Sequence, residues 1–388
     1  MRPFLFGLLV LLVIGAIGFF TTAASMVDRQ RNLVVPDTSR LPTAAAESLH
    51  RMLRVADLHA DALLWPRDLL VRQNHGHVDL PRLQQGGVAL QVFSVVTKTP
   101  RGINYERNSA NTDNITLLAA AERYPLRAWG SLFARAIHQS QILHAAARRS
   151  NGALRVITSQ LQLDEAMAAR ATNPVVVAGL LATEGVHPLE GHLEYVDSMA
   201  AAGFRMFGLT HFFDNEVGGS AHGEVKGGLT PFGRSVIERL DALSMIIDVA
   251  HASPALIDDV LKLSKRPIVV SHTGVQGVCP GPRNLTDDQL QRIAAKGGMV
   301  GIGFWDGAIC TPTLASAAKS IAYAVRVAGE DHVALGSDFD GSTTVPIDAT
   351  GYPRLTQALL DEGLAPSQIT KVMGENAIRV IRELLPAR

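Results

Sequence analysis

This chain of 388 residues has no formal net charge and only two cysteines. Basic and acidic residues number 36 each, so the formal net charge is zero. Because nucleic-acid binding needs a basic patch or stripe and none is present, we expect no nucleic-acid partner. No cysteine precedes Cys279, which excludes lipid attachment at an N-terminal cysteine. Low-complexity tracts and internal repeats are also absent, and residues 383–388 offer no hydrophobic tail for a glycolipid anchor.

A single long hydrophobic run is present, at the N-terminus. Residues 4–20 are uncharged and apolar, with only Arg2 as a charge before them and small residues after them at 22–25. The run is short for a bilayer span and long for the core of a signal peptide, and it has no polar face to suit a buried helix. We expect residues 1–25 to be a signal anchor or signal peptide, 26–48 a tether, and 49–388 the folded domain. That domain would lie on the extracytoplasmic side of the cell membrane, or be secreted if the segment is cleaved.

The remaining chain alternates apolar runs with amphipathic stretches. The runs predict strands at 55–59, 88–96, 175–183, 205–210, 245–250, 267–271, 299–304 and 332–337. Alternating strands and helices predict a parallel sheet, and eight strands favour a closed (β/α)₈ TIM barrel. The long connection from 96 to 175 contains two helical stretches, 110–124 and 126–149, so we expect a helical excursion after the second strand. Residues 355–385 predict two closing helices, with Pro366 and Ser367 capping the second.

Side chains of metal-binding types recur where these strands end. His59 and Asp61 follow the first strand, two residues apart, and so face the same side of an extended segment. Later strand ends carry the remaining candidates, namely Glu184, His211, Asp248, His251, His272, Asp338 and Asp340. Since the active sites of TIM barrels lie on the face formed by the carboxyl ends of the strands, these side chains should converge there.

Each candidate has a simpler explanation when it is taken alone. A lone His-x-Asp pair occurs by chance, a histidine at a strand end is commonly a satisfied polar group, and Glu184 before a glycine fits an ordinary loop. Together they are different, because burying four histidines and several carboxylates at one end of a barrel is costly without a cation. Imidazole and carboxylate ligands suit zinc or a related transition metal. We therefore expect two divalent ions bridged by one carboxylate.

With these motifs, the chain resembles the membrane (renal-type) dipeptidases, a branch of the metal-dependent amidohydrolase barrels. The resemblance covers about residues 55–385. It rests on Asp57-Leu-His59-Ala-Asp61, His77-Val-Asp79-Leu-Pro-Arg-Leu83, Glu184, Leu209-Thr-His211, Asp248-Val-Ala-His251, Ser271-His272, Arg283-Asn284 and Ser337-Asp338-Phe-Asp-Gly341. It implies zinc-dependent hydrolysis of dipeptides, including those with a D-residue at the C-terminal position, and it suggests a homodimer.

The resemblance also implies a ligand set for two Zn²⁺ ions per chain. His59 and Asp61 would hold the first ion. His251 and His272 would hold the second. Glu184 would bridge the two and belong to the catalytic set, with a hydroxide between the ions as the nucleophile.

Further roles follow from the same resemblance. Asp338 would carry a proton from the attacking water to the leaving amine, and His211 would hydrogen-bond the carbonyl oxygen as it becomes negative. Arg283 would pair with the free carboxylate of the substrate, supported by Asn284, so that all four side chains belong to the substrate site. Residues 212–222 depart from the mammalian members and should reshape the pocket, with His222 in a loop over it rather than on a metal. Asp340 receives no catalytic role, and Asp79 should fix its loop with Arg82.

Cys279 and Cys310 permit two interpretations by themselves. They are two buried thiols or, in an exported protein, a disulfide. Family members that this chain resembles carry a disulfide at this pair of positions. The resemblance therefore implies a bridge that holds the Arg283 loop and that requires an oxidising compartment.

Two alternative functions remain open. One is another metal-dependent amidase or lactonase on the same barrel, which would have no need of Arg283 if its substrate lacked a carboxylate. The other is a catalytically idle, membrane-tethered binding protein. The second is disfavoured because every expected ligand and Asp338 are present.

Overall fold

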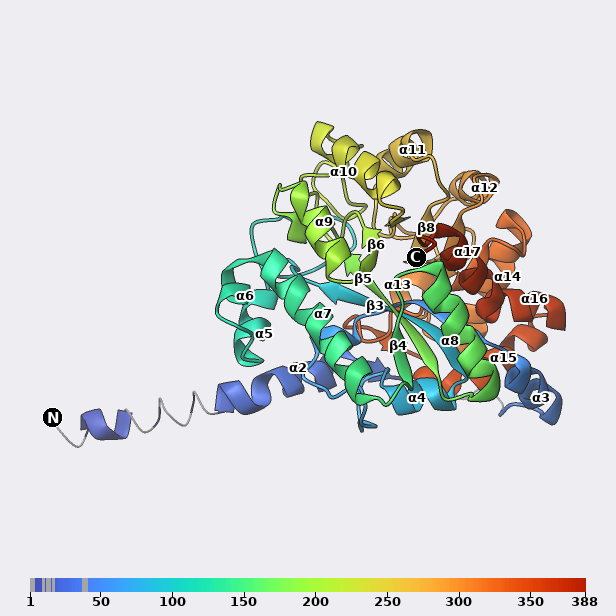
Figure 1. Cartoon of the computed structure of the whole chain (residues 1–388), viewed down its shortest axis with the longest axis horizontal. Helices are drawn as coiled ribbons and strands as arrows, with labels where there is room; N and C mark the ends of the chain where they lie inside the picture. The colour runs from blue at the N-terminus through green and yellow to red at the C-terminus, as the bar shows by residue number, and fades with distance from the viewer. Residues whose placement is uncertain (1–3, 9–10, 12–14, 16–17, 37–40) are drawn as a thin grey trace.

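The computed structural model describes residues 4–8, 11, 15, 18–36 and 41–388. Eight parallel strands close into a barrel surrounded by helices (Figure 1). They are β2 (Val55–Ala60), β3 (Val88–Val96), β5 (Val177–Glu184), β6 (Phe204–Gly208), β7 (Ile246–Asp248), β8 (Val269–Thr273), β9 (Met299–Ile302) and β10 (Val333–Leu335). The order around the ring is β3-β2-β10-β9-β8-β7-β6-β5, and pairing of β3 with β5 closes it. The predicted TIM barrel is confirmed.

Every strand of this ring is fully or almost fully buried, because side chains fill the interior and helices cover the outside. The outer helices include α4 (Leu80–Gln85), α9 (Glu194–Ala201), α10 (Pro231–Ala242), α11 (Pro254–Leu263), α12 (Asp287–Ala295) and α14 (Leu314–Ala328). Shorter turns of helix are η2 (Ala62–Leu64), η3 (His187–Leu189), α13 (Asp306–Ile309) and η4 (Ala349–Gly351). Four of the outer helices begin at an N-cap residue whose hydroxyl accepts a hydrogen bond from the backbone N–H three residues later. These N-cap residues are Thr230, Ser253, Thr286 and Thr313.

The excursion between β3 and β5 is helical, as predicted. It contains α5 (Ile115–Ala121), α6 (Arg127–Gly130), α7 (Leu132–Arg149) and α8 (Gln160–Thr172). The stretch 126–149 is not one helix, because Ser131 is extended and its hydroxyl caps α7 by accepting from Ala134 N. A short strand, β4 (Leu154–Val156), pairs with the first residues of β5 and was not predicted.

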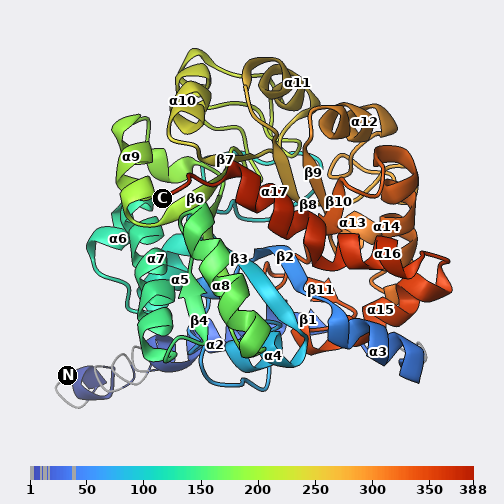
Figure 2. The ribbon, with the colours of Figure 1, turned by 45° about the vertical axis from the view of Figure 1, so that its right-hand side comes forward.

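The C-terminal segment closes the barrel at the end opposite the strand carboxyl ends. It comprises α15 (Tyr352–Asp361), α16 (Pro366–Thr370), η5 (Lys371–Glu375) and α17 (Asn376–Leu384). Helix α17 runs across one end of the barrel in Figure 2, and its apolar face packs on interior side chains such as Leu58 and Met206. The predicted cap is wrong by one position, since Ala365 is the N-cap and Pro366 is the first helical residue. Pro366 has no N–H to satisfy there, which suits it to that position.

The expected tether, residues 26–48, is mostly packed structure. A π-helical turn, η1 (Phe19–Ala23), leads into α2 (Ala24–Arg31) and β1 (Leu33–Val34), and β1 pairs in parallel with β11 (Thr344–Val345). Helix α3 (Ala44–Met52) then packs against α15. Residues 37–40 of the tether, and much of the run 4–20, lie outside the described residues. Among the helices that are described, none is long and apolar enough to cross a membrane.

Candidate metal centre and active site

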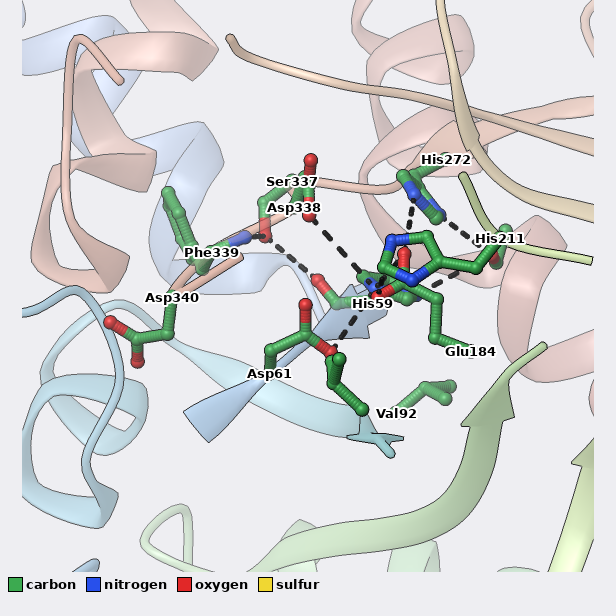
Figure 3. Close-up of polar contacts among 12 residues, drawn as sticks. His59, Asp61, Val92, Glu184, His211, His272, Ser337, Asp338, Phe339 and Asp340 are labelled. Carbon is green, nitrogen blue, oxygen red and sulfur yellow. Dashed lines mark hydrogen bonds and ion pairs between the residues drawn. The ribbon is translucent and has the colours of Figure 1, made fainter. Parts of the chain in front are cut away.

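The candidate ligands meet at the carboxyl ends of the strands, around Glu184 (Figure 3). Glu184 is the last residue of β5 and is buried. Its Oε1 lies 3.1 Å from His251 Nε2, 3.3 Å from His272 Nε2 and 3.6 Å from His59 Nε2. Its Oε2 lies 3.3 Å from His211 Nε2. One carboxylate therefore faces four imidazole nitrogens from residues in or just after four different strands.

The same side chains form two groups that could each hold an ion. Ligand atoms of Glu184, His59, His272 and Asp338 lie within 4.8 Å of one another, and so do those of Glu184, His211 and His251. Both groups contain Glu184, which suits a bridging carboxylate. The His272 ring stacks on His59 with centroids 3.8 Å apart, and its Nε2 also lies close to His251 Nε2, so His272 is next to a histidine of each expected pair.

The protonation of three of these histidines fits a bound cation. Burial lowers the pKa of His211, His251 and His272 well below the ordinary value, so each presents a neutral imidazole with a free lone pair. The Nε2 atoms of His251 and His272 lie only 3.0 Å apart. Burial, and then the charge of Asp61, raise the pKa of Glu184 well above its usual range. A divalent ion would relieve both the crowded lone pairs and the carboxylate repulsion.

Two further atoms favour a cation at this position. His59 Nε2 and Asp61 Oδ1 are buried and lack hydrogen-bond partners, and they lie 3.4 Å apart. Buried polar atoms are normally satisfied, so an unpartnered nitrogen and oxygen side by side are expected where a metal ion would bind. The residues present thus fit a divalent metal centre.

Buried carboxylates that are not ligands hold the strand ends in place. Asp57 accepts from Ser337 N at 2.8 Å and from Ser337 Oγ at 2.6 Å, which attaches the end of β10 to β2. Asp248 accepts from Ala250 N and Ser271 N, each at 2.9 Å. These bonds occupy the carboxylates with backbone and hydroxyl donors, and we assign both aspartates a structural role.

The loop after β10 places Asp338 at the site in a strained conformation. Its φ is +58°, in the left-handed region that non-glycine residues rarely adopt. Gly341 is required beside it, because a Cβ there would lie 2.1 Å from Asp338 Oδ1. Burial raises the pKa of Asp338 to about 8, and its Oδ1 lies 3.9 Å from His59 Nε2.

Two other carboxylates lie away from the metal centre, in agreement with the sequence interpretation. Asp340 accepts from His77 N at 2.7 Å and pairs with Arg67 Nη2 at 2.8 Å, and Figure 3 shows it pointing away from Glu184. Asp79 caps α4 and lies 3.3 Å from Arg82 Nη1. In the contacts just described, neither carboxylate meets a candidate metal ligand.

Arg283 faces a cavity of about 640 Å³ that also contacts Asp61, Glu184, His211, His251 and Asp338. Its Nη2 donates to His272 O at 2.7 Å, its Cζ lies 5.2 Å from the centre of the Trp305 ring, and its Nε has no partner. A buried guanidinium with unused donors in a cavity suits a carboxylate ligand.

The loops around Arg283 are held by Asn284 and by a disulfide. Asn284 Nδ2 donates to Cys279 O at 2.7 Å and to Gly307 O at 3.0 Å, so this amide supports the loop and does not face the cavity. Cys279 and Cys310 are bonded, with Cα atoms 5.4 Å apart, and they join the loops that follow β8 and β9. The disulfide prediction is confirmed.

The loop 212–222 covers one side of the site, as expected. Phe212 lines the cavity and its ring stacks on His222 with centroids 4.9 Å apart. His222 Nδ1 donates to Tyr105 O at 2.7 Å, and the ring belongs to neither group of candidate ligands. His222 therefore supports the wall of the pocket.

Several cavity residues were missed from the sequence. Tyr105 and Trp305 line the pocket, as do Phe19, Ala23 and Val27 of the N-terminal segment. No motif marks them, because Tyr105 lies in an irregular stretch and the N-terminal residues lie in or just after a run that matches a targeting signal. Trp305 alone had a signal, since it follows a predicted strand end.

Comparison with known proteins agrees with this geometry. The model of the membrane dipeptidase family (peptidase family M19) matches residues 43–387. The chain is 28% identical over 359 residues to the dipeptidase aclJ of Aspergillus oryzae, covering 85% of this chain and 78% of that protein. It is 33% identical over 261 residues to an uncharacterised protein of the pqqA 5′ region of Klebsiella pneumoniae, covering 63% of this chain and 94% of that protein.

Solved structures share the fold. A metallopeptidase of Rhodobacter sphaeroides, liganded with a phosphinate mimic of L-Ala-D-Ala, has a TM-score of 0.68 at 25% identity, covering 85% of this chain and 98% of its own. The probable dipeptidase PvdM of Pseudomonas aeruginosa has a TM-score of 0.72 at 21% identity, covering 88% and 97%. With the family match extending over most of the chain and the candidate metal ligands gathered together, the protein belongs to the membrane dipeptidase family and is a metallo-dipeptidase.

Proposed function

We propose that this metallo-dipeptidase works with two zinc ions bridged by Glu184 and accepts dipeptides with a D-residue at the C-terminal position. The observation that carries the two-ion proposal is the position of Glu184, whose two oxygens face four histidine nitrogens. The similarity to a metallopeptidase liganded with a mimic of L-Ala-D-Ala supports the stereochemical part.

The residues that would hold the ions are Glu184, His59, Asp61, His251 and His272. Divalent ions bound there would lower the pKa of a water molecule and polarise the scissile carbonyl. The chain itself would supply orientation. Glu184 and the strand ends fix the geometry, and burial of the polar side chains limits their contact with bulk water.

Asp338 is our candidate for the proton carrier. Its carboxylate lies beside His59 in the cavity. Its pKa of about 8 is near neutral pH, and a group whose pKa is near the working pH can both accept and donate a proton. It would take a proton from the attacking water and deliver it to the leaving amine nitrogen. The strained backbone at this residue fits such a role.

His211 and Arg283 would bind the substrate. Burial keeps His211 neutral, so it carries one N–H that can donate to the carbonyl oxygen as negative charge develops. Its proximity to Glu184 and His251 also permits metal ligation. The metal content of His211→Ala separates the two roles, because a substrate donor can be removed without loss of an ion.

The two-ion proposal is tested by elemental analysis combined with activity on Ala-Ala of L,L and L,D configuration. Wild-type protein should contain close to two ions per chain and should prefer or accept the L,D form. Glu184→Ala should lose metal and nearly all turnover, whereas Glu194→Ala, at an exposed position on α9, should lose neither. At most one tightly bound ion, with no reactivation on adding zinc, would refute the two-metal centre.

We further propose that the catalytic domain lies outside the cytoplasm, attached to the membrane by residues 1–25 or secreted after their cleavage, and that it forms a homodimer. The disulfide supports an oxidising compartment. Cell fractionation with N-terminal sequencing tests the placement. Light scattering of the purified protein tests the dimer, and a monomeric mass would refute it.

A further inference from the structure

The N-terminal segment, residues 19–34, lies outside the part of the chain that matches the family, which begins at residue 43. It nevertheless reaches the active-site cavity. Phe19, Ala23 and Val27 line the same cavity as Glu184 and Arg283. Figure 1 shows this segment leaving the body of the barrel beside α5. The wall that this segment adds to the site therefore lies outside the residues matched to the family.

Buried charges attach this segment to the barrel. Asp28 of α2 is fully buried, and its Oδ2 pairs with Arg67 Nε at 3.0 Å. Arg67 Nη2 also pairs with Asp340 Oδ1 at 2.8 Å, so one guanidinium joins α2 to the loop that carries Asp338. A buried ion pair of this kind holds a defined geometry, because losing one partner leaves an unpaired charge in the interior.

Backbone pairing fixes the segment further. Asn32 Nδ2 donates to Asp28 Oδ1 at 2.8 Å, and Asn32 Oδ1 accepts from Ser342 N at 2.9 Å. Leu33 N then donates to Thr343 O at 3.1 Å as β1 pairs with β11. Ser342 and Thr343 directly follow Gly341, so the loop that carries Asp338 positions the wall.

The wall is apolar apart from Arg31, which also lines the cavity, and apolar side chains of the neighbouring helix α5 continue it. Phe19, Ala23 and Val27 are accompanied there by Leu117, Leu118 and Ala121 of α5. The cavity of about 640 Å³ lies within the roughly 300–1,000 Å³ that takes a drug-sized ligand, which leaves room beyond two small residues. An apolar chamber of this kind gains free energy from burying an apolar substituent.

The wall's place in the barrel indicates which end of the substrate it meets. Arg283, the proposed carboxylate anchor, follows β8, whereas the segment is attached after β10, two strands further around the ring. The wall is therefore near the end of the substrate that Arg283 does not hold. On the proposed dipeptidase function, that end carries the N-terminal residue.

We propose that, in the chain that keeps its N-terminus, residues 19–34 are a specificity-determining wall that selects dipeptides with a large apolar side chain at the N-terminal position. Full-length wild-type protein should therefore cleave Phe-Ala with a higher kcat/KM than Ala-Ala. Val27→Asp places a charge in the apolar wall and should lower kcat/KM for Phe-Ala about fivefold to tenfold more than for Ala-Ala, the factor expected when roughly 40–60 Å² of apolar contact is lost. Ala23→Trp, which fills the chamber, should act in the same direction.

Met26→Asp is the matched control. Met26 neighbours Val27 on α2, is 55% exposed and does not line the cavity, whereas Val27 is 41% exposed and does. The control should leave the Phe-Ala to Ala-Ala ratio within twofold of wild type. An unchanged ratio in Val27→Asp and Ala23→Trp, or an equal change in Met26→Asp, would overturn the proposal.

Failure of the dipeptidase function itself is distinguishable. If wild-type protein cleaves neither dipeptide, the proposed function fails, and titration calorimetry with the same two peptides tests the wall alone. Tighter binding of Phe-Ala than of Ala-Ala that Val27→Asp abolishes would still support the wall. Equal binding of the two peptides by wild type would refute it.

Discussion

Replacing Arg283 with methionine removes the guanidinium while keeping a long side chain. Arg283 is 5% exposed, uses Nη2 on His272 O, and leaves Nε without a partner in the cavity. A substrate carboxylate can take such unused donors. The variant should therefore lose selectivity for a free carboxylate, whereas Arg283→Lys, which keeps the charge but not the planar fork, should lose part of it.

The size of the effect follows from the chemistry of the contact. A hydrogen bond to a charged group contributes about 1.5–3 kcal/mol, which corresponds to roughly 10- to 150-fold in kcat/KM. Amidating the C-terminus of a good dipeptide should cost the wild-type enzyme about that factor. In Arg283→Met the acid and the amide should differ by less than about threefold.

The assay is steady-state hydrolysis of Ala-Ala and Ala-Ala amide by wild type and both variants, with metal content measured for each. The metal measurement is needed because Arg283 bonds to the backbone of His272, so displacement of that ligand would depress both rates together. A variant that keeps full metal and also keeps the wild-type preference for the acid would refute the pairing. That result would favour the general amidase alternative.

The other predictions concern turnover and stability. Asp338→Asn should keep its metal and lose about 10²–10⁴-fold in kcat, and a metal-free variant would make Asp338 a ligand. Replacing Cys279 and Cys310 together by serine opens a loop with a sequence separation of 31 residues and should cost about 3–4 kcal/mol of unfolding free energy, measured with urea, so a loss below about 1 kcal/mol would contradict it. Burial, and then the charge of Asp28, raise the pKa of Glu122 from 4.5 to about 9, so the folded state holds a proton that the unfolded state releases. The stability of wild-type protein, measured as the midpoint of thermal unfolding, should therefore fall as the pH rises from 4.5 to 9. The midpoint of Glu122→Gln should fall less over the same range. Parallel curves of midpoint against pH for the two proteins would refute this explanation.

The barrel could be predicted because each of its strands has a strong local signal. β3 occupies residues 88–96, as expected, and the other ring strands differ from their predicted bounds by a few residues at most. A strand buried on both faces is a continuous apolar run between polar turns, which is readable without knowledge of its neighbours. β4 has three residues and is only partly buried, so it presents no such run.

The residue types of the metal centre were also readable, because strand ends of a parallel barrel must meet on one face. The sequence did not indicate which histidines would lie side by side. His272 lies beside both His59 and His251, and His211 also lies with His251, since the twist and register of the strands set these distances.

The sequence by itself determined the barrel, the positions of the candidate ligands and the pair of cysteines, because local periodicity and strand-end chemistry carry that information. Only the tertiary structure decided that the N-terminal segment belongs to the active site. Its placement depends on Asp28 meeting Arg67 and on β1 meeting β11, about 310 residues away in the chain. Such long-range pairings leave no local pattern, since a buried ion pair is recognised only when the fold brings its two partners together.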